Sequence, residues 1–448
     1  MSIGDLPFAD QLDLDTVESA DVVIVGGGAA GVAAAVGARQ AAPNARIIIL
    51  ESEACLGGAM THRGVAAYCG LYTIEDKPRQ AIGSIWNDLK RRLLKVQGTT
   101  EDIVRHRGVF QMVEPECVKL VLDDVMADYN IEVLLHTPVV GAIRNSDNTV
   151  ASVRIQERRG YRDISAKAFI DCSGDGDLAA HSGASVRLGN HGTINLGSLA
   201  TRYGGLPHSL QPTATIWRNA IIAAKKKDPN LRKALPKDGS VLLRLPTSGD
   251  VITFMASAFY DPRTSAGITA AEVSGRKQAQ MYLDILRKLP GHENMYIVST
   301  GPNFGTRETL HINAVYQLVE DDLTSGRHFE DVIALGAWGM EFHDVNDRVW
   351  ASTFKYIPNK VFDIPLRCLQ SIDTPNLLAA GRCVDGDQYA SSSVRVMGTA
   401  LATGQAAGVA AGMMVLKGLD RWAVVDVQNC LRENGAFLRN EDLPIVNV

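Results

Sequence analysis

Two short apolar runs near the start of the chain have the length and composition of buried strands. They are Asp21–Val25 and Ile47–Leu50, and the alanine-rich segment between them, which extends to about Ala42, predicts a helix. A strand, a helix and a second strand in this order predict a βαβ unit with two parallel strands. Amphipathic spacing predicts two further helices, at residues 82–95 and 114–128.

Four shorter apolar segments follow, at Ile131–Leu135, Val139–Arg144, Val150–Gln156 and Asp163–Asp171. Turn-forming residues separate them, so that neighbouring segments can pair as hairpins. We therefore predict a small antiparallel sheet beside the parallel one.

Beyond residue 188 the pattern is mixed and less regular. Helices are predicted at Ala214–Lys227, Ala271–Leu289 and Glu308–Glu320, and a buried strand that ends in glycine returns at Pro375–Gly381. The chain thus leaves the first domain and comes back to it.

We predict an α/β fold with two domains. A discontinuous Rossmann-like domain, with a parallel sheet and a small antiparallel sheet, comprises residues 18–187 and 356–448. An inserted α+β substrate or cap domain comprises residues 188–355.

The segment Met397–Leu416 carries no charge and contains glycine at every fourth position, at Gly404, Gly408 and Gly412. In a lipid bilayer this spacing lets two helices touch. The segment is mostly Ala, Gly and Thr, however, and is only weakly hydrophobic. We predict a helix buried against a sheet or a ligand, and no membrane contact.

Composition narrows the class of protein. Hydrophobic residues make up 46% of the 448 positions and charged residues 21%, which excludes an intrinsically disordered chain. The formal net charge of −5 argues against a nucleic-acid binder. Seven widely spaced cysteines without a C-x-x-C pair give no support for a metal site or a disulfide framework. Together with an acidic start that lacks an apolar segment, they predict a cytoplasmic protein. The pattern favours no particular oligomeric state.

The first strand is followed by a glycine motif of the dinucleotide-binding kind, Gly26-x-Gly28-x-x-Gly31. The first glycine permits a tight turn, the second lets the backbone approach a pyrophosphate, and the third lets the helix pack on the strand. The helix N-terminus presents free N–H groups to the phosphates. Glu51, at the end of the second strand, is placed to accept hydrogen bonds from ribose hydroxyls and disfavours a 2′-phosphate. The sequence therefore predicts a bound dinucleotide other than NADP.

Two more strand-then-glycine segments distinguish FAD from NAD. They are Asp171–Asp177 and Leu378–Arg382, and an extended flavin nucleotide needs such additional backbone contacts along its length. In several stretches the chain resembles the FAD-dependent oxidoreductases related to succinate dehydrogenase and fumarate reductase flavoproteins. These stretches are Val23–Gly31, Leu56–Gly58, Phe169–Leu178, Arg307–Thr309, Asp363–Cys368, Asn376–Cys383, Ser393–Thr399 and Gly404–Gly408. The resemblance covers residues 20–417 and implies a glutathione-reductase-type FAD domain.

The resemblance implies the following FAD contacts. The pyrophosphate lies on Gly26, Gly28, Ala29, Ala30 and Gly31, the adenosine ribose on Glu51 and Ser52, and the adenine near Val139. The flavin side runs past Gly57, Gly58, Ala59, Met60 and Arg63, and past Gly174, Asp175, Asp177, Gly381 and Arg382. Gly398, Thr399 and Ala400 face the pyrimidine end of the flavin, where the helix dipole would stabilise negative charge.

Three residues are candidates for catalysis: His62, His343 and Arg395. His343 is a candidate proton acceptor, and Arg395 a group that binds an anion. His62 lies in the loop expected beside the flavin and is also a candidate for a covalent flavin bond. The family's arginine pair is replaced by Leu310 and His311, and a structural helix position is favoured for His311.

Arg307 and Glu308 are predicted to form a buried ion pair. An ion pair of Arg395 with Asp385 or Asp387 is the structural alternative to anion binding.

The predicted function is hydride transfer between a small organic substrate and the flavin, by a dehydrogenase or an oxidase. No second glycine motif for a pyridine nucleotide follows a strand. One alternative is a monooxygenase that uses NAD(P)H and O2, because Asp175 and Gly176 match the position of its DG motif. The other is a protein that holds flavin for binding or RNA modification.

Overall fold

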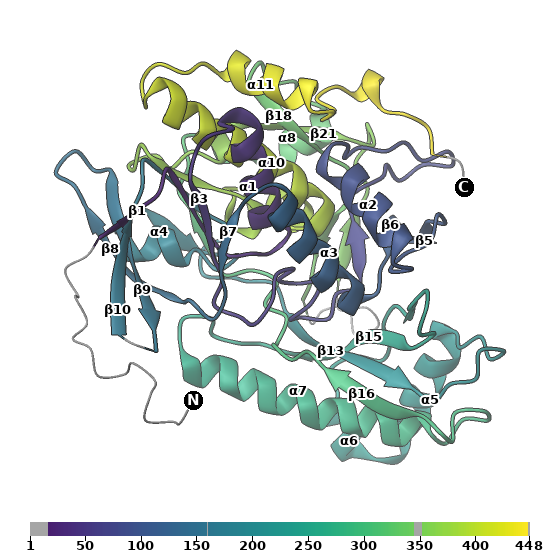
Figure 1. Ribbon diagram of the computed structural model, residues 1–448. Helices are drawn as coiled ribbons and strands as arrows, with labels where there is room; N and C mark the ends of the chain where they lie inside the picture. Colours follow the sequence, from purple (N-terminus) through teal and green to yellow (C-terminus); the bar gives the residue numbers. More distant parts are fainter. Residues whose placement is uncertain (1–16, 159, 345–351, 447–448) are drawn as a thin grey trace, which may run out of the picture.

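The computed structural model describes residues 17–158, 160–344 and 352–446, and a five-stranded parallel sheet forms its centre (Figure 1). The strand order is β22-β11-β2-β3-β7, and every neighbouring pair is parallel. The bounds are β2 Val22–Val25, β3 Ile47–Leu50, β7 Glu132–Leu134, β11 Ala168–Asp171 and β22 Leu377–Ala379. The predicted α/β fold with a Rossmann-like domain is confirmed.

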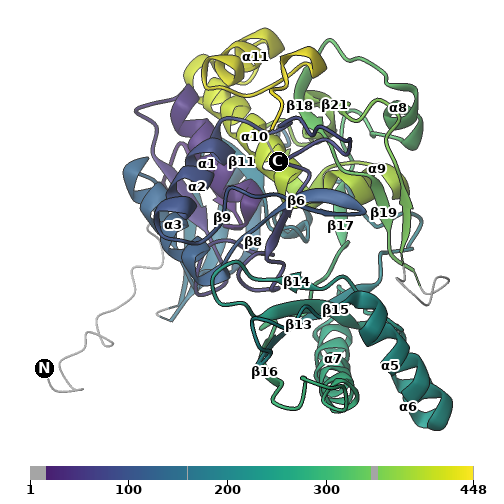
Figure 2. The same ribbon diagram turned by 90° about the vertical axis from the view of Figure 1, so that its right-hand side faces the viewer.

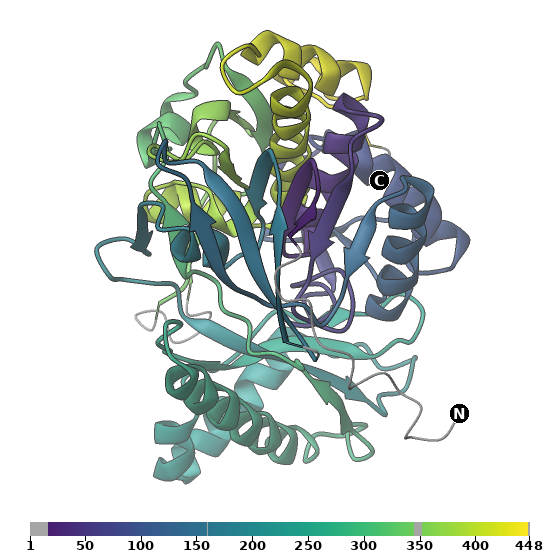
Figure 3. The same cartoon turned by 60° about the vertical axis from the view of Figure 1, so that its left-hand side comes forward.

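The antiparallel sheet has the order β1-β10-β9-β8, and its long hairpins are visible in Figure 3. Its strands are β1 Glu18–Ser19, β8 Val139–Arg144, β9 Val150–Glu157 and β10 Gly160–Ser165. Two predictions were wrong in detail. The segment at 131–135 pairs with β3 in the parallel sheet, and the segment at 163–171 is two strands, because the chain crosses from one sheet to the other near Ala166.

The helices around the parallel sheet include the predicted pair near residues 82–95 and 114–128. They are α1 Ala29–Ala41, α2 Ile85–Lys95, α3 Pro115–Asp128, α4 Asp177–His181, α8 Glu320–Ser325, α9 Gln388–Val394, α10 Met397–Lys417 and α11 Val424–Glu433. Smaller sheets complete this part, formed by β4 Ala67–Cys69, β5 Val104–His106, β6 Gly108–Met112, β12 Val186–Leu188, β17 Leu310–Ile312, β18 Val332–Gly336, β19 Met340–Phe342, β20 Thr353–Lys355 and β21 Phe362–Pro365.

Helices α1 and α10 pack directly on each other through small residues. A methyl group on Gly404 or Gly408 would overlap the carbonyl oxygen of Ala30 or Ala34 in α1. Among the described residues α10 is the helix long and apolar enough to cross a membrane, and most of it lies buried inside the protein. Its composition is thus that of a core helix.

Residues 197–300 form a lobe with its own sheet and its own apolar core, and Figure 2 shows this lobe below the rest of the molecule. The sheet order is β14-β15-β13-β16, with β13 Gly197–Gly204, β14 Leu243–Arg244, β15 Val251–Ala258 and β16 Tyr296–Thr300. Helices α5 Ala214–Lys227, α6 Pro229–Ala234 and α7 Ser265–Leu286 belong to it.

The domain boundaries at 188 and 355 stay a prediction. The packing shows to which apolar core the residues after the lobe belong. Apart from Trp338, the buried apolar residues between Leu318 and Met340 belong to the same core as α1 and α10, and not to the core of the lobe.

The predicted helix at Glu308–Glu320 was wrong. Residues Leu310–Ile312 are a strand that pairs with β12, and the following residues are mostly irregular up to α8. Tertiary contacts override helical spacing here, because His311 is held between the carbonyl of Val384 and the carboxylate of Glu308.

Candidate active site

A long cleft of about 230 Å³ lies where the strands of the parallel sheet end. The turns after β2, β3, β11 and β22 all contribute residues to it. Parallel α/β sheets bind ligands at the carboxyl ends of their strands, because the loops there converge. The glycine motif and the two later glycine segments therefore meet in one place.

The three glycines of the motif have different local roles. Gly26 has a φ of +97°, which favours glycine, and a methyl group on Gly31 would overlap the carbonyl oxygen of Gly26. Gly28 is different, since its added methyl carbon would meet only the Cα of Gly58, at 3.7 Å. Gly28 also lines the cleft, so the space beside it is available to a ligand.

Glu51 is buried at the end of β3 and fixes the shape of this end of the cleft. One carboxylate oxygen, Oε2, accepts a hydrogen bond from the Gly27 N–H at 2.7 Å, and the other, Oε1, accepts one from the Glu53 N–H at 2.9 Å. Oε1 also accepts a hydrogen bond from Ser52 Oγ at 3.3 Å, whereas Oε2 retains a second lone pair that can accept a hydroxyl hydrogen. The geometry is compatible with the predicted ribose contact.

Asp175 joins two arginines at the opposite end of the cleft. Arg63 and Arg382 each place Nη2 at 3.1 Å from its carboxylate. Burial alone would raise the pKa of Asp175, but these two guanidinium groups lower it to about 2. Asp177 forms no ion pair within the described part of the chain, and burial together with the nearby charges of Asp175 and Asp171 raises its pKa to about 7.

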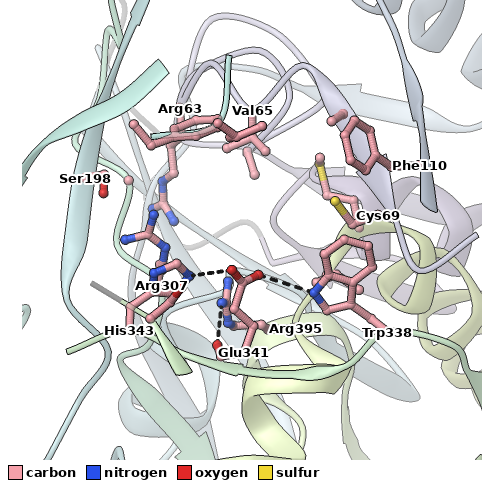
Figure 4. A pocket seen from close by; sticks show the side chains of 18 of the residues that line it. Arg63, Val65, Cys69, Phe110, Ser198, Arg307, Trp338, Glu341, His343 and Arg395 are labelled. Carbon is pink, nitrogen blue, oxygen red and sulfur yellow. Dashed lines mark hydrogen bonds and ion pairs between the residues drawn. The ribbon is translucent and has the colours of Figure 1, made fainter. Parts of the chain in front are cut away.

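A second cavity of about 220 Å³ adjoins the cleft (Figure 4). The two share a wall made of Ala59, Arg63, Arg382, Arg395 and Met397. A molecule in the second cavity would thus lie beside one end of a ligand in the cleft. The remaining walls include residues 65–69, residues 106–110, the lobe, residues 305–307, and the described residues 338–343 and 352–354.

The charges around the second cavity are mostly positive. Its basic residues are Arg63, Arg107, Lys237, Arg307, Arg382 and Arg395. Glu341 is the carboxylate among the described residues that line this cavity. His343 Nε2 lies 3.7 Å from Glu341 Oε1, and Arg395 Nη2 donates to the backbone carbonyl of Glu341 at 3.0 Å.

Burial shifts the proton affinities of these bases. It lowers the pKa of Arg307 to about 10, and the nearby positive charge of Arg395 contributes. Burial also lowers the pKa of Lys237 well below its usual value, with Arg307 adding to the effect. Lys237 Nζ donates to the Phe254 carbonyl at 3.0 Å. A negatively charged ligand would offset the cost of burying these groups.

Comparison with known proteins identifies the family. The sequence model of FAD-dependent oxidoreductases matches residues 21–433. The chain belongs to this FAD-dependent oxidoreductase family. It is therefore an enzyme, and its cofactor is FAD. No curated protein matches the sequence of this oxidoreductase.

Solved structures similar to the oxidoreductase are distant in sequence. A p-nitrophenol 4-monooxygenase from Pseudomonas putida DLL-E4 is 13% identical with a TM-score of 0.49, covering 92% of this chain and 84% of its own. A geranylgeranyl bacteriochlorophyll reductase-like protein from Thermoplasma acidophilum is 12% identical with a TM-score of 0.47, covering 94% and 85%. A flavocytochrome c3 fumarate reductase in an open conformation is 14% identical with a TM-score of 0.39, covering 89% and 79%.

The residues of the oxidoreductase fit FAD on two independent observations. First, the cleft is open beside Gly28, where a dinucleotide backbone contact is expected. Second, within the described part of the chain Arg395 Nε is buried and makes no hydrogen bond, and Arg395 lines the cleft. Arg395 stands two residues before α10, whose first N–H groups lack helical partners and favour negative charge.

Most of the predicted FAD contacts of the oxidoreductase line the cleft. These are Gly26, Gly28, Ala29, Ala30, Glu51, Ser52, Gly58, Ala59, Arg63, Val139, Gly174, Asp175, Asp177, Gly381, Arg382 and Ala400. The others lie behind the surface: Gly31, Gly57, Met60, Gly398 and Thr399. Gly398, for example, packs against the backbone of Cys69 and Gly70, and Met60 is fully buried in the core.

The structure brings two of the three predicted catalytic residues together. His343 and Arg395 both line the second cavity. His62 lines the cleft instead, and its Nε2 lies 2.8 Å from the carbonyl oxygen of Cys55. The three candidate side chains therefore do not all line one cavity.

The predicted ion pair of Arg307 with Glu308 was also wrong. Arg307 donates to the carbonyl of Leu196 and lines the second cavity, whereas Glu308 contacts His311 and the side chain of Asn195. The two side chains point in opposite directions, as neighbouring residues of an extended segment do.

Sequence analysis missed several residues of the second cavity. They are Phe110, Lys237 and the neighbours Trp338 and Glu341, which come from three separate stretches of the chain and belong to no shared motif. The signal that could have found Glu341 is its position two residues before His343. For the other three residues we see no local signal.

Proposed function

We propose that the oxidoreductase transfers a hydride between a small organic acid and FAD. The observation that carries this proposal is the shared wall of the two cavities, at which Arg395 reaches from the FAD cleft into the positively charged second cavity. A dehydrogenase or oxidase reaction is the form that we favour.

The charge balance supports an anionic substrate. Asp175 neutralises one of the two arginines that it contacts, and among the described residues that line the cavity Glu341 is the carboxylate that offsets Arg307 and Arg395. An excess of positive charge therefore faces the cavity. Guanidinium groups bind carboxylates through paired N–H donors, so a substrate carboxylate can replace the missing counter-charge.

FAD would be held by the glycine motif, Glu51 and the residues after β11 and β22, and when bound it accepts or supplies the hydride. The protein's own contribution begins with orientation. Arg395 and Arg307 fix the carboxylate end of the substrate near the shared wall. This limits the positions that the reacting carbon can occupy.

His343 is placed to hold the proton that accompanies the hydride. Its imidazole is buried at the cavity wall, with Nε2 at 3.7 Å from Glu341 Oε1. Glu341 also accepts a hydrogen bond from the Trp338 indole N–H at 3.4 Å. The carboxylate can thus orient the imidazole and stabilise its protonated form.

The test is anaerobic reaction of the purified holoenzyme with small acids. Hydroxy, amino and saturated acids are mixed with the oxidised enzyme, and unsaturated acids with the dithionite-reduced enzyme, while the visible flavin absorbance is followed. We expect at least one acid to change the redox state of the flavin. The methyl ester of that acid should react at least tenfold more slowly.

A matched pair of variants tests the arginine. Arg395→Gln should lose this reaction, while Arg276→Gln, a substitution on the exposed side of α7, should leave it unchanged. Readmission of air then separates an oxidase from a dehydrogenase. If NADPH bleaches the flavin rapidly only when a substrate is bound, the enzyme is a monooxygenase. If no reductant reduces the flavin, a protein that only holds flavin is supported instead.

A further inference from the structure

The second cavity has two chemically different halves. Figure 4 shows Arg63, Arg307 and His343 on one side and Phe110, Cys69 and Trp338 on the other. The apolar side is one continuous cluster of side chains: Ala67, Cys69, Phe110, Val241, Leu243, Phe254, Trp338, Phe354 and Val396. The basic groups therefore do not surround the substrate evenly.

The apolar half is built from rings with fixed positions. Trp338 and Phe354 pack edge to face, with ring centroids 5.6 Å apart and an interplanar angle of 84°. The Trp338 indole N–H points to Glu341 at the polar side, which leaves the ring itself to the apolar half. Burial raises the pKa of the Cys69 thiol, so that this side chain is neutral as well.

Arg107 is the basic residue nearest to these rings, but its guanidinium group is already engaged. It donates to Ser352 Oγ at 3.1 Å and lies over the Phe354 ring, 5.3 Å from the centroid. It thus contributes to the wall. A second carboxylate at this end of the substrate would have to compete with these contacts or lie against apolar side chains.

From these observations we propose that the substrate is a monocarboxylate with an apolar body, such as a single aromatic ring or a short branched chain. This inference rests on the proposed function, because it places the carboxylate at Arg395 and Arg307. The apolar body fills the half formed by Phe110, Trp338 and Phe354. The volume of about 220 Å³ is below the roughly 300–1,000 Å³ of sites for drug-sized ligands, so the body is small.

The experiment measures binding to the holoenzyme by calorimetry and by the change in the flavin spectrum, without turnover. The first series is acetate, propanoate, butanoate and pentanoate. Each buried methylene should tighten binding about fourfold. Butanoate and succinate form a matched pair, since succinate replaces the terminal methyl by a carboxylate. We expect butanoate to bind at least tenfold more tightly than succinate. Phenylacetate should bind at least tenfold more tightly than phenylacetamide.

Two variants locate the apolar half. Phe354→Leu should weaken phenylacetate binding several-fold and leave acetate binding unchanged, whereas Phe259→Leu, at an exposed position outside the cavity, should affect neither. Tighter binding of succinate than of butanoate would overturn the inference, and so would equal affinities along the methylene series.

The outcomes separate this inference from the proposed function. If phenylacetate binds as expected but no acid changes the redox state of the flavin, the substrate class stands and the reaction is wrong. If dicarboxylates react with the flavin and monocarboxylates fail to bind, the reaction stands and the substrate class is wrong.

Discussion

An added methyl group should impair different properties at two glycines of the same motif, Gly31 and Gly28. In Gly31→Ala the new methyl group overlaps the carbonyl oxygen of Gly26 and contacts Cys172, and neither can move away from a packed strand–helix junction. In Gly28→Ala it meets only the Cα of Gly58, at 3.7 Å, and projects into the cleft. We expect Gly31→Ala to impair folding and Gly28→Ala to impair FAD binding.

The magnitudes follow from the packing. Inserting a methyl group into a packed site costs about 1–3 kcal/mol, and overlap with backbone places Gly31→Ala near the upper end. Gly28 is the N-cap residue of α1, so its replacement by alanine should reduce the free energy of unfolding by about 1 kcal/mol or less. The same 1–3 kcal/mol, applied to bound FAD, weakens its affinity about 5- to 140-fold in Gly28→Ala.

The assay has two parts on the apo-protein. Urea denaturation gives the free energy of unfolding of each variant, and titration with FAD, followed by flavin fluorescence, gives Kd. An unchanged Kd in Gly28→Ala would refute the assignment of this turn to the pyrophosphate. Equal destabilisation of the two variants would refute the division of roles between the two glycines.

Three further predictions concern packing, pH and the flavin linkage. Gly408→Ala should lower the free energy of unfolding by about 1–3 kcal/mol, because its methyl group overlaps a backbone carbonyl of α1. The control variant Gly141→Ala should change the free energy of unfolding by less than about 0.5 kcal/mol in the same urea measurement. The folded-state pKa of Asp177 is raised to about 7, so the free energy of unfolding falls as the pH rises from about 4 to 7. Asp177→Asn should therefore stabilise the apo-protein at pH 8 and not at pH 4. The gain should be less than about 1 kcal/mol, because water in the cleft screens the charge. A stabilisation that is the same at both pH values would contradict this reasoning. Acid denaturation of the holoenzyme should release all flavin into the supernatant, since His62 Nε2 is held at 2.8 Å from a loop carbonyl; flavin that stays with the precipitate would show a covalent bond.

Local sequence determined the cofactor half of the site. The motif from Gly26 to Gly31, the acid at Glu51 and the later glycine segments act within single turns, and each requires a particular residue for a local reason. A tight turn, a close backbone approach and a helix N-terminus can be predicted from a few neighbouring residues. For the same reason most of the predicted FAD contacts line the cleft.

The substrate half was decided only by the tertiary structure. The second cavity combines Phe110, Lys237, Glu341 and Arg395, which are separated by about 50 to 130 residues along the chain and come from different strands and loops. Their proximity depends on how the lobe of residues 197–300 packs against the Rossmann-like domain. The same dependence explains the wrong helix at Glu308–Glu320, because long-range contacts and not residue spacing fix that segment. A local pattern can state where a cofactor lies, but the chemistry of the facing cavity is a property of packing between distant parts of the chain.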